Sequence, residues 1–128
     1  MVLKSFAKLN LSLRVNKKLN NGFHDLQTIY CQINLSDKIF IKKNKINKDS
    51  ISFYGPHSKY ISIYKNSVKK CMSILRKKKL VSNFYSIKIY KEIPVFGGLG
   101  GGTSNAAAIV KFFVKNRMRK KIFKKISK

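Results

Sequence analysis

Apolar and polar positions alternate along residues 5–15, near the start of the chain. The apolar positions are Ala7, Leu9, Leu11, Leu13 and Val15, and the polar positions between them are Lys8, Asn10, Ser12 and Arg14. A period of two residues is typical of a β-strand that buries one face. The pattern predicts a strand whose apolar face joins the core. Its other face would carry Lys8 and Asn10, roughly 7 Å apart along the strand.

After residue 15, apolar runs alternate with short breaks that are polar or contain glycine. Such an arrangement predicts strands separated by turns and loops. The predicted strands cover residues 26–35, 38–43, 51–54 and 84–91, and the breaks cover 20–22 (Asn-Asn-Gly), 36–37 (Ser-Asp), 44–49 and 55–56 (Gly-Pro).

Two other segments have the composition and spacing of helices. Residues 66–80 place apolar side chains at i, i+3, i+4 and i+7, namely Val68, Cys71, Met72 and Leu75. Asn66 or Ser67 can cap the start of this helix. A second helix is expected over 103–114, which is rich in alanine. Residues 116–128 are rich in Lys and Arg, and we expect them to form a ragged helix end or a basic tail.

Five of the seven glycines lie within residues 97–102, between the last predicted strand and the second helix. Glycines let backbone N–H groups converge on a ligand, and a helix start adds free N–H groups and the positive end of the macrodipole. The segment therefore predicts a phosphate site. It matches neither the P-loop, which needs a lysine after Gly102, nor the dinucleotide fingerprint, which needs a glycine in place of Thr103.

Length and composition limit the class of protein. The chain has 128 residues and is 44% hydrophobic, which is enough for one domain or part of a larger one. No apolar run is long enough to span a membrane, and charged residues within the first 15 positions argue against a signal peptide. Cys31 and Cys71 are isolated and show neither metal-ligand spacing nor a disulfide framework. We therefore expect a cytoplasmic protein.

The net charge is +25, from 29 Lys and Arg against 4 Asp and Glu. Taken alone, such a charge favours a nucleic acid or another anionic surface as partner. The lysines are spread along the whole chain, however, and Lys, Asn and Ile share A/T-rich codons. A biased genome would give this composition to any protein. A nucleic acid is therefore not the expected partner, and a basic RNA-binding module is kept as an alternative.

Three motifs in order resemble one superfamily of kinases. Residues 94–108 (Pro-Val-Phe-Gly-Gly-Leu-Gly-Gly-Gly-Thr-Ser-Asn-Ala-Ala-Ala) resemble the ATP loop of the GHMP kinases. Residues 7–11 (Ala-Lys-Leu-Asn-Leu) and 21–28 (Asn-Gly-Phe-His-Asp-Leu-Gln-Thr) resemble motifs of its 4-diphosphocytidyl-2-C-methyl-D-erythritol kinase family. Asn21 replaces the usual Asp, and Phe23 replaces the usual Tyr. The resemblance covers residues 5–115.

The resemblance implies an α+β fold of the ribosomal protein S5 domain 2-like class, with a mostly antiparallel sheet and helices on one face. Residues 1–115 would form a truncated N-terminal, ATP-binding GHMP kinase domain, and 116–128 its basic helix end or tail. The C-terminal GHMP domain would be absent. We expect such an incomplete domain to leave apolar sheet surface uncovered.

The activity implied by the resemblance is ATP-dependent phosphorylation of the 2-hydroxyl of 4-diphosphocytidyl-2-C-methyl-D-erythritol in the non-mevalonate isoprenoid route, with Mg²⁺. The implied ATP-binding residues are Pro94, Val95, Phe96, Gly97, Gly98, Leu99, Gly100, Gly101, Gly102, Thr103, Ser104, Asn66 and Lys91. Lys8 would be catalytic, beside the reacting hydroxyl and the γ-phosphate. Asn10, Phe23 and His24 would bind the substrate, with Phe23 and His24 on the cytosine.

The family's catalytic aspartate, in a Gly-Ala-Asp-(Val/Ile)-Pro segment beyond the glycine loop, has no counterpart here. The four acidic residues stand in other contexts and are Asp25, Asp37, Asp49 and Glu92. We expect the chain alone to be inactive or nearly so, because loss of such a base costs on the order of 10²–10⁴ in rate. A separate chain carrying the C-terminal half would complete it. Another GHMP small-molecule kinase is the remaining alternative.

Overall fold

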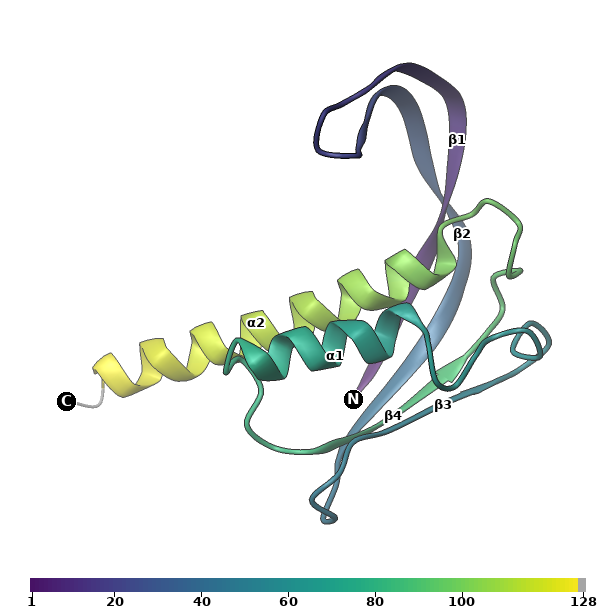
Figure 1. The fold of residues 1–128 in the computed structure, drawn as a ribbon. Helices are drawn as coiled ribbons and strands as arrows, with labels where there is room; N and C mark the ends of the chain where they lie inside the picture. The colour runs from purple at the N-terminus through teal and green to yellow at the C-terminus, as the bar shows by residue number, and fades with distance from the viewer. Residues whose placement is uncertain (127–128) are drawn as a thin grey trace.

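The computed structural model describes residues 1–126, and the side chains of residues 1–118. Its elements are β1 (Val2–Lys18), β2 (His24–Lys43), β3 (Ser50–Tyr54), α1 (Ser67–Lys77), β4 (Tyr85–Tyr90) and α2 (Gly101–Ile126). The strands form one sheet in the order β1-β2-β4-β3, and both helices lie on one face of it (Figure 1). β1 and β4 each pair with β2 in antiparallel fashion, and β3 pairs with β4 in parallel. The expected α+β fold is confirmed.

The core lies between the sheet and the two helices. The sheet contributes alternate residues of its central strands, which are Ile39, Ile41, Ile87 and Ile89. The helices contribute Val68, Cys71, Met72, Leu75, Ile109 and Phe113. Fully burying an aliphatic or aromatic side chain of this size contributes about 1.5–3 kcal/mol, so this cluster fixes the helices on the sheet. Burial also raises the pKa of the Cys71 thiol, whose Sγ lies 3.6 Å from the Ala106 carbonyl oxygen of α2.

Helix α1 starts where the sequence predicts and ends earlier. Asn66 is the N-cap, and its side chain accepts a hydrogen bond from the Lys69 N–H. The helix ends at Lys77 because Lys79 adopts a left-handed backbone conformation with φ 55°. The chain then turns into β4, which places β4 beside β3 in parallel.

The predicted turn at Ser36 and Asp37 is wrong, because β2 runs without interruption from His24 to Lys43. Asp37 is fully buried within this strand. Its Oδ1 accepts hydrogen bonds from the backbone N–H groups of Glu92 and Ile93, each at 2.9 Å. Ser-Asp favours a turn as a local sequence, but here the tertiary partners of the carboxylate override that preference.

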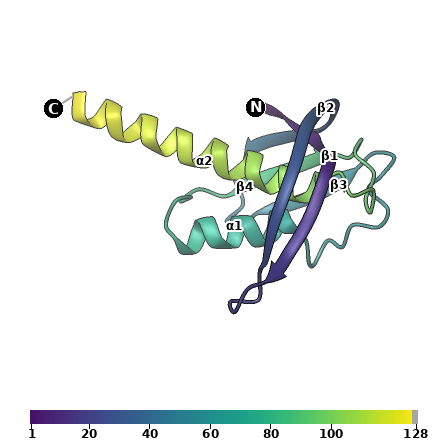
Figure 2. The same cartoon turned by 90° about the horizontal axis from the view of Figure 1, so that it is seen from above.

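Beyond Lys8, the hairpin of β1 and β2 projects away from the rest of the molecule (Figures 1 and 2). The turn at residues 20–22 lies at its tip, as predicted, with Gly22 at φ +84°. The predicted burial of the apolar face of β1 is confirmed only at Ala7. At Leu11, Leu13 and Val15 it is wrong, since each is more than half exposed. No helix lies over this half of the hairpin in the described part of the chain.

Helix α2 begins two positions before the predicted start and continues to Ile126. Of the two expectations for residues 116–128, a continued helix is therefore confirmed as far as Ile126, and 127–128 lie outside the described residues. The later turns of α2 extend past the end of α1 (Figures 1 and 2). Within residues 1–126, neither helix combines the length and apolar character needed to cross a membrane.

Candidate functional site

The glycine-rich segment forms a loop between β4 and the start of α2. Gly98 and Gly100 have φ angles of +68° and +67°, in the left-handed region that favours glycine. Phe96 has φ +68° as well, although it carries a side chain, and this side chain is exposed. The left-handed conformation costs a non-glycine residue roughly 1–2 kcal/mol. Backbone strain of this kind clusters at functional sites.

Strand β1 holds the end of this loop. The Lys8 N–H donates to the Leu99 carbonyl oxygen at 2.9 Å. The Ser104 hydroxyl donates to the Phe6 carbonyl oxygen at 2.8 Å and accepts from the Ser5 hydroxyl at 3.0 Å. Ser104 therefore fastens α2 to β1. Thr103, which precedes Ser104, is exposed and borders the cavity described next. Its hydroxyl is therefore the one that a ligand in the cavity can reach.

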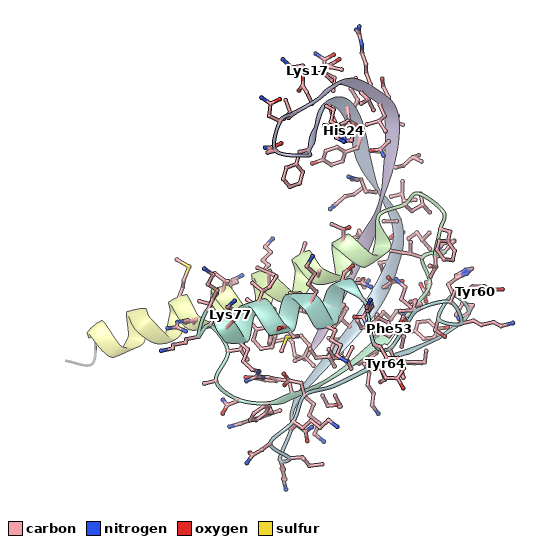
Figure 3. The ribbon with its side chains drawn as sticks, viewed as in Figure 1. Lys17, His24, Phe53, Tyr60, Tyr64 and Lys77 are labelled. Atoms are coloured by element: carbon pink, nitrogen blue, oxygen red, sulfur yellow. The ribbon has the colours of Figure 1, made fainter. Side chains whose placement is uncertain are left out.

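A cavity of about 440 Å³ lies between the loop, the start of α2 and the segment that leads into α1. Its walls include residues 94–103 together with Tyr60, Asn66 and Lys91. This volume is within the range of small-molecule sites. At its outer end the Tyr60 and Phe96 rings approach to 6.3 Å between centroids, and Figure 3 shows Tyr60 beside the loop. The predicted ATP-binding residues, except Ser104, thus border one cavity.

Lys91 and Asp37 form a buried ion pair at the base of this cavity. Lys91 is 2% exposed and Asp37 is 0% exposed, and the Lys91 Nζ donates to the Asp37 Oδ2. A Cβ added at Gly101 would lie 3.2 Å from the Lys91 Nζ, so the ammonium group sits directly under the start of α2. A cation beside the positive end of a helix is unfavourable, and the Asp37 carboxylate offsets this. Sequence reasoning missed Asp37 because Ser-Asp resembles a turn.

Two asparagines border the cavity, and they differ in whether the side-chain amide is hydrogen-bonded. Asn66 uses both ends of its amide: its Oδ1 accepts from Lys69 N–H at 2.8 Å, and its Nδ2 donates to the Ser62 carbonyl oxygen at 2.9 Å. Asn105 is 1% exposed, and its Oδ1 has no hydrogen-bond partner in the described part of the chain. Buried polar atoms are nearly always paired, so this oxygen is available to accept a hydrogen bond from a donor in the cavity. Asn105 was not predicted as a site residue, although it directly follows Thr103 and Ser104.

Lys8 lies next to the loop, on one face of the hairpin. A Cβ added at Gly100 would lie 3.8 Å from the Lys8 Cε, and the Lys8 Nζ lies 5.1 Å from the centroid of the Tyr30 ring. Asn10 is on the same face, because it pairs with Tyr30 and its Oδ1 accepts from the Thr28 hydroxyl at 3.4 Å.

The same face continues to the tip of the hairpin. His24, Thr28 and Tyr30 are separated by even numbers of residues along β2, so their side chains lie on the same face of the strand. His24 therefore shares the face of Lys8 and Asn10. Figure 3 shows His24 at the tip, away from the helices. Phe23 precedes it and is exposed. The structure thus aligns Lys8, Asn10 and His24 but does not bring Phe23 or His24 to the cavity.

Comparisons with known proteins identify this arrangement. Residues 66–120 match the family model described as the GHMP kinases N terminal domain. The chain is 38% identical over 129 aligned residues to the 4-diphosphocytidyl-2-C-methyl-D-erythritol kinase of Pelagibacter ubique, covering 98% of this chain and 45% of that protein. The same-named kinase of Ureaplasma parvum is 39% identical over 117 residues, covering 90% of this chain and 44% of that protein.

The fold gives the same answer. A crystal structure of 4-(cytidine 5'-diphospho)-2C-methyl-D-erythritol kinase superposes with a TM-score of 0.62 and 26% identity, over 91% of this chain and 39% of that one. In sequence and in fold, the chain matches the N-terminal domain of the GHMP kinases. The chain spans less than half the length of the curated relatives named above.

The cavity suits the nucleotide that GHMP kinases use. Its volume, the glycine loop and the helix start fit a phosphorylated ligand, and the Asn105 Oδ1 could accept a hydrogen bond from an amino or hydroxyl group of that ligand. Within residues 1–118, no three His, Cys, Asp or Glu side chains come together as a metal site.

Proposed function

We propose that this chain supplies the nucleotide-binding half of an ATP-dependent kinase that phosphorylates the 2-hydroxyl of 4-diphosphocytidyl-2-C-methyl-D-erythritol, a step of the non-mevalonate isoprenoid route. The observation that carries the proposal is the cavity between the glycine-rich loop and α1, with Lys8 beside the loop. The names of the relatives support the choice of substrate.

In this proposal the ATP phosphates lie on the backbone N–H groups of residues 97–102 and on the start of α2. ATP supplies the transferred phosphoryl group. Mg²⁺ binds in such sites mainly through substrate phosphates and a few protein oxygens, and the Thr103 hydroxyl is placed to be one of them. The Asn105 Oδ1 accepts a hydrogen bond from the nucleotide.

Lys8 acts as a fixed positive charge next to the phosphate loop. Phosphoryl transfer depends on positioning and charge stabilisation more than on covalent help from the protein. The ammonium group of Lys8 would stabilise negative charge that develops on the reacting hydroxyl and the γ-phosphate.

The substrate lies along the same face of the hairpin. By strand geometry, His24 and Tyr30 are roughly 20 Å apart along β2. A substrate that contacts both ends must therefore be extended, with its base on Phe23 and His24 and its reacting hydroxyl near Asn10 and Lys8. An alcohol joined to cytidine through a diphosphate has this form.

No acidic side chain of the described chain lines the cavity, and each of the four is engaged by another group. Asp37 pairs with Lys91, Asp49 with Arg76 at 2.6 Å, and Glu92 with Lys38 at 3.5 Å. Asp25 accepts from the Asn16 amide at 3.2 Å, near the hairpin tip. A catalytic base must therefore come from the part of the family's length that this chain does not span. We expect little or no turnover from the chain alone.

The test is to measure MgATP binding to the full chain by calorimetry, and turnover after adding the C-terminal part of the Pelagibacter ubique relative. Lys8→Met should leave ATP affinity within about twofold while reducing turnover at least about 10²-fold. Lys4→Met, an exposed change on the same strand, is the matched control and should change neither. Failure of the wild-type chain to bind ATP would overturn the proposal, as would full turnover by Lys8→Met.

A further inference from the structure

One face of the sheet points away from the helices and carries lysine, aromatic and serine side chains. Ile39, Ile87 and Ile89 point to the opposite face, where both helices pack (Figure 1). Because successive side chains of a strand point to opposite sides, the residues next to these isoleucines form the outer face. This outer face, hereafter the open face, consists of the even-numbered residues within 2–4, 38–42, 50–54 and 86–90. None of them borders the candidate nucleotide cavity.

The strand register brings two lysines and two tyrosines into one row across the four strands. Lys4 pairs with Lys38, which pairs with Tyr90. Tyr90 in turn pairs with Tyr54, and the two ring centroids are 5.2 Å apart. The Lys38 Nζ lies 5.7 Å from the centroid of the Tyr90 ring, and Tyr54 is 42% exposed. The row therefore places ammonium groups beside aromatic rings at the surface, over a width of roughly 14 Å by strand geometry.

The neighbouring rows continue this pattern and add positive charge. Phe40 pairs with Lys88, and Lys42 follows Phe40 on the same face of β2. Both lysines are exposed. Of the ion pairs among the described side chains, only that of Lys38 with Glu92, at 3.5 Å, involves a lysine of the open face. Three of the four lysines of this face thus have no carboxylate partner among the described side chains.

We propose that the open face binds single-stranded RNA. Lysines neutralise phosphates, and aromatic rings give unpaired bases a surface on which to stack. Four-stranded sheets with aromatic side chains on one face stack two or three bases in this way, and Phe40, Tyr54 and Tyr90 supply three rings. The hydroxyl groups of Ser50 and Ser52 lie on the same face and can bond with ribose 2′-hydroxyl groups, which favours RNA over DNA. An acidic peptide would match the charge of this face but would leave the rings unused.

The open face could not be recognised in the sequence, where the lysines are spread along the whole chain. A biased codon composition explains how many lysines the chain has. Only the sheet register places four of them between three aromatic rings, from segments that lie far apart in the sequence. The inferred binding is additional to the proposed kinase activity and does not depend on it.

The test is fluorescence anisotropy of a labelled uridine decamer with the full chain, in sodium chloride between about 0.05 and 0.2 M. If four lysines contact phosphates, the logarithm of the association constant should fall with the logarithm of salt concentration with a slope of about −3. Lys42→Met/Lys88→Met should reduce the slope to about −1.5 and weaken binding about tenfold. The matched control, Lys70→Met/Lys77→Met, removes the same charge from exposed positions of α1, on the other side of the sheet, and should bind as the wild type does.

Stacking is tested separately with Tyr54→Thr, which keeps a β-forming residue and the net charge. Its affinity for RNA should fall at least about fivefold. The control Tyr64→Thr changes an exposed tyrosine outside the open face and should leave the affinity unchanged. A deoxyuridine decamer should bind more weakly because it lacks the 2′-hydroxyl, and an RNA duplex because its bases are already paired. Polyglutamate should also bind more weakly, because its carboxylates do not stack on the rings.

Several results would overturn the inference. They are no binding of the decamer to the wild-type chain, equal effects of the two lysine double variants, unchanged affinity of a folded Tyr54→Thr, and binding of DNA, duplex or polyglutamate as tight as that of single-stranded RNA. Displacement of the RNA by MgATP would place it at the glycine-rich loop and would also count against the open face. Melting temperatures show whether each variant folds, and the lysine variants decide the matter if Tyr54→Thr does not. Loss of MgATP binding with intact RNA binding would refute only the kinase proposal.

Discussion

The ion pair of Asp37 and Lys91 sets how the glycine-rich loop leaves the sheet. Asp37 uses one oxygen for the N–H groups of Glu92 and Ile93 and the other for the Lys91 ammonium. One carboxylate therefore fixes both the backbone just before the loop and the cation just under α2. A residue in the middle of β2 thus shapes a site formed mainly by residues 94–105.

Breaking this pair should destabilise the protein strongly. Lys91→Met leaves a buried carboxylate without its cation, and we expect a loss of about 3–5 kcal/mol in the free energy of unfolding, measured with urea. Lys38→Met breaks the half-exposed pair with Glu92 and should cost about 0–1 kcal/mol.

A second variant guards against the case in which Lys91→Met does not fold. Combining it with Asp37→Asn removes the uncompensated charge and should recover part of the lost stability. Equal, small losses for Lys91→Met and Lys38→Met would show that the pair has no such role.

Among the elements, α1 links fold and site through its first residue. Asn66 caps the helix and also holds the preceding segment through the Ser62 carbonyl oxygen. It borders the cavity at the same time. Its two roles, capping and contact with the nucleotide, can be separated by substitution.

Asn66→Ala should lower stability by about 1 kcal/mol, because it removes the cap. Asn66→Asp keeps the acceptor for Lys69 N–H but loses the donor to the Ser62 carbonyl oxygen, so stability should recover only in part. If the side chain also contacts ATP, Asn66→Asp should still weaken ATP binding about tenfold, since it replaces the amide donor with a negative charge. Thermal unfolding and calorimetry give the two quantities. Wild-type ATP affinity in Asn66→Asp would limit the residue to capping.

At the scale of the whole molecule, the net charge of +25 sets how the chain responds to salt. Excess positive charge destabilises a compact state through self-repulsion. Only three ion pairs with Asp or Glu are present among the described side chains, and they engage a small share of the 29 Lys and Arg.

Sodium chloride should therefore raise the melting temperature between about 0.02 M and 0.5 M, because the Debye length falls from roughly 20 Å to 4 Å. The salt should be a chloride and not a sulfate, because sulfate resembles phosphate and could stabilise the protein by binding to the glycine-rich loop. Differential scanning fluorimetry at matched protein concentration measures the shift. A constant or falling melting temperature would show that self-repulsion does not limit stability.

The elements with a strong local pattern could be predicted from sequence. The Asn66 cap, the glycine loop before an alanine-rich helix, and the turn at residues 20–22 depend on the conformational preferences of a few neighbouring residues. The three sequence motifs indicated the resemblance to the GHMP kinases. These features sufficed for the α+β fold and for most of the residues that border the cavity.

Only the tertiary structure decided which of these residues are buried, paired or free. It placed Asp37 inside a continuous strand, committed the Ser104 hydroxyl to β1 and left the Asn105 Oδ1 without a partner. It also left Leu11, Leu13 and Val15 of β1 exposed, although their alternation with polar residues predicts a buried face. The physical reason is that periodicity reports which side chains share a face, whereas burial depends on whether another part of a polypeptide packs against that face.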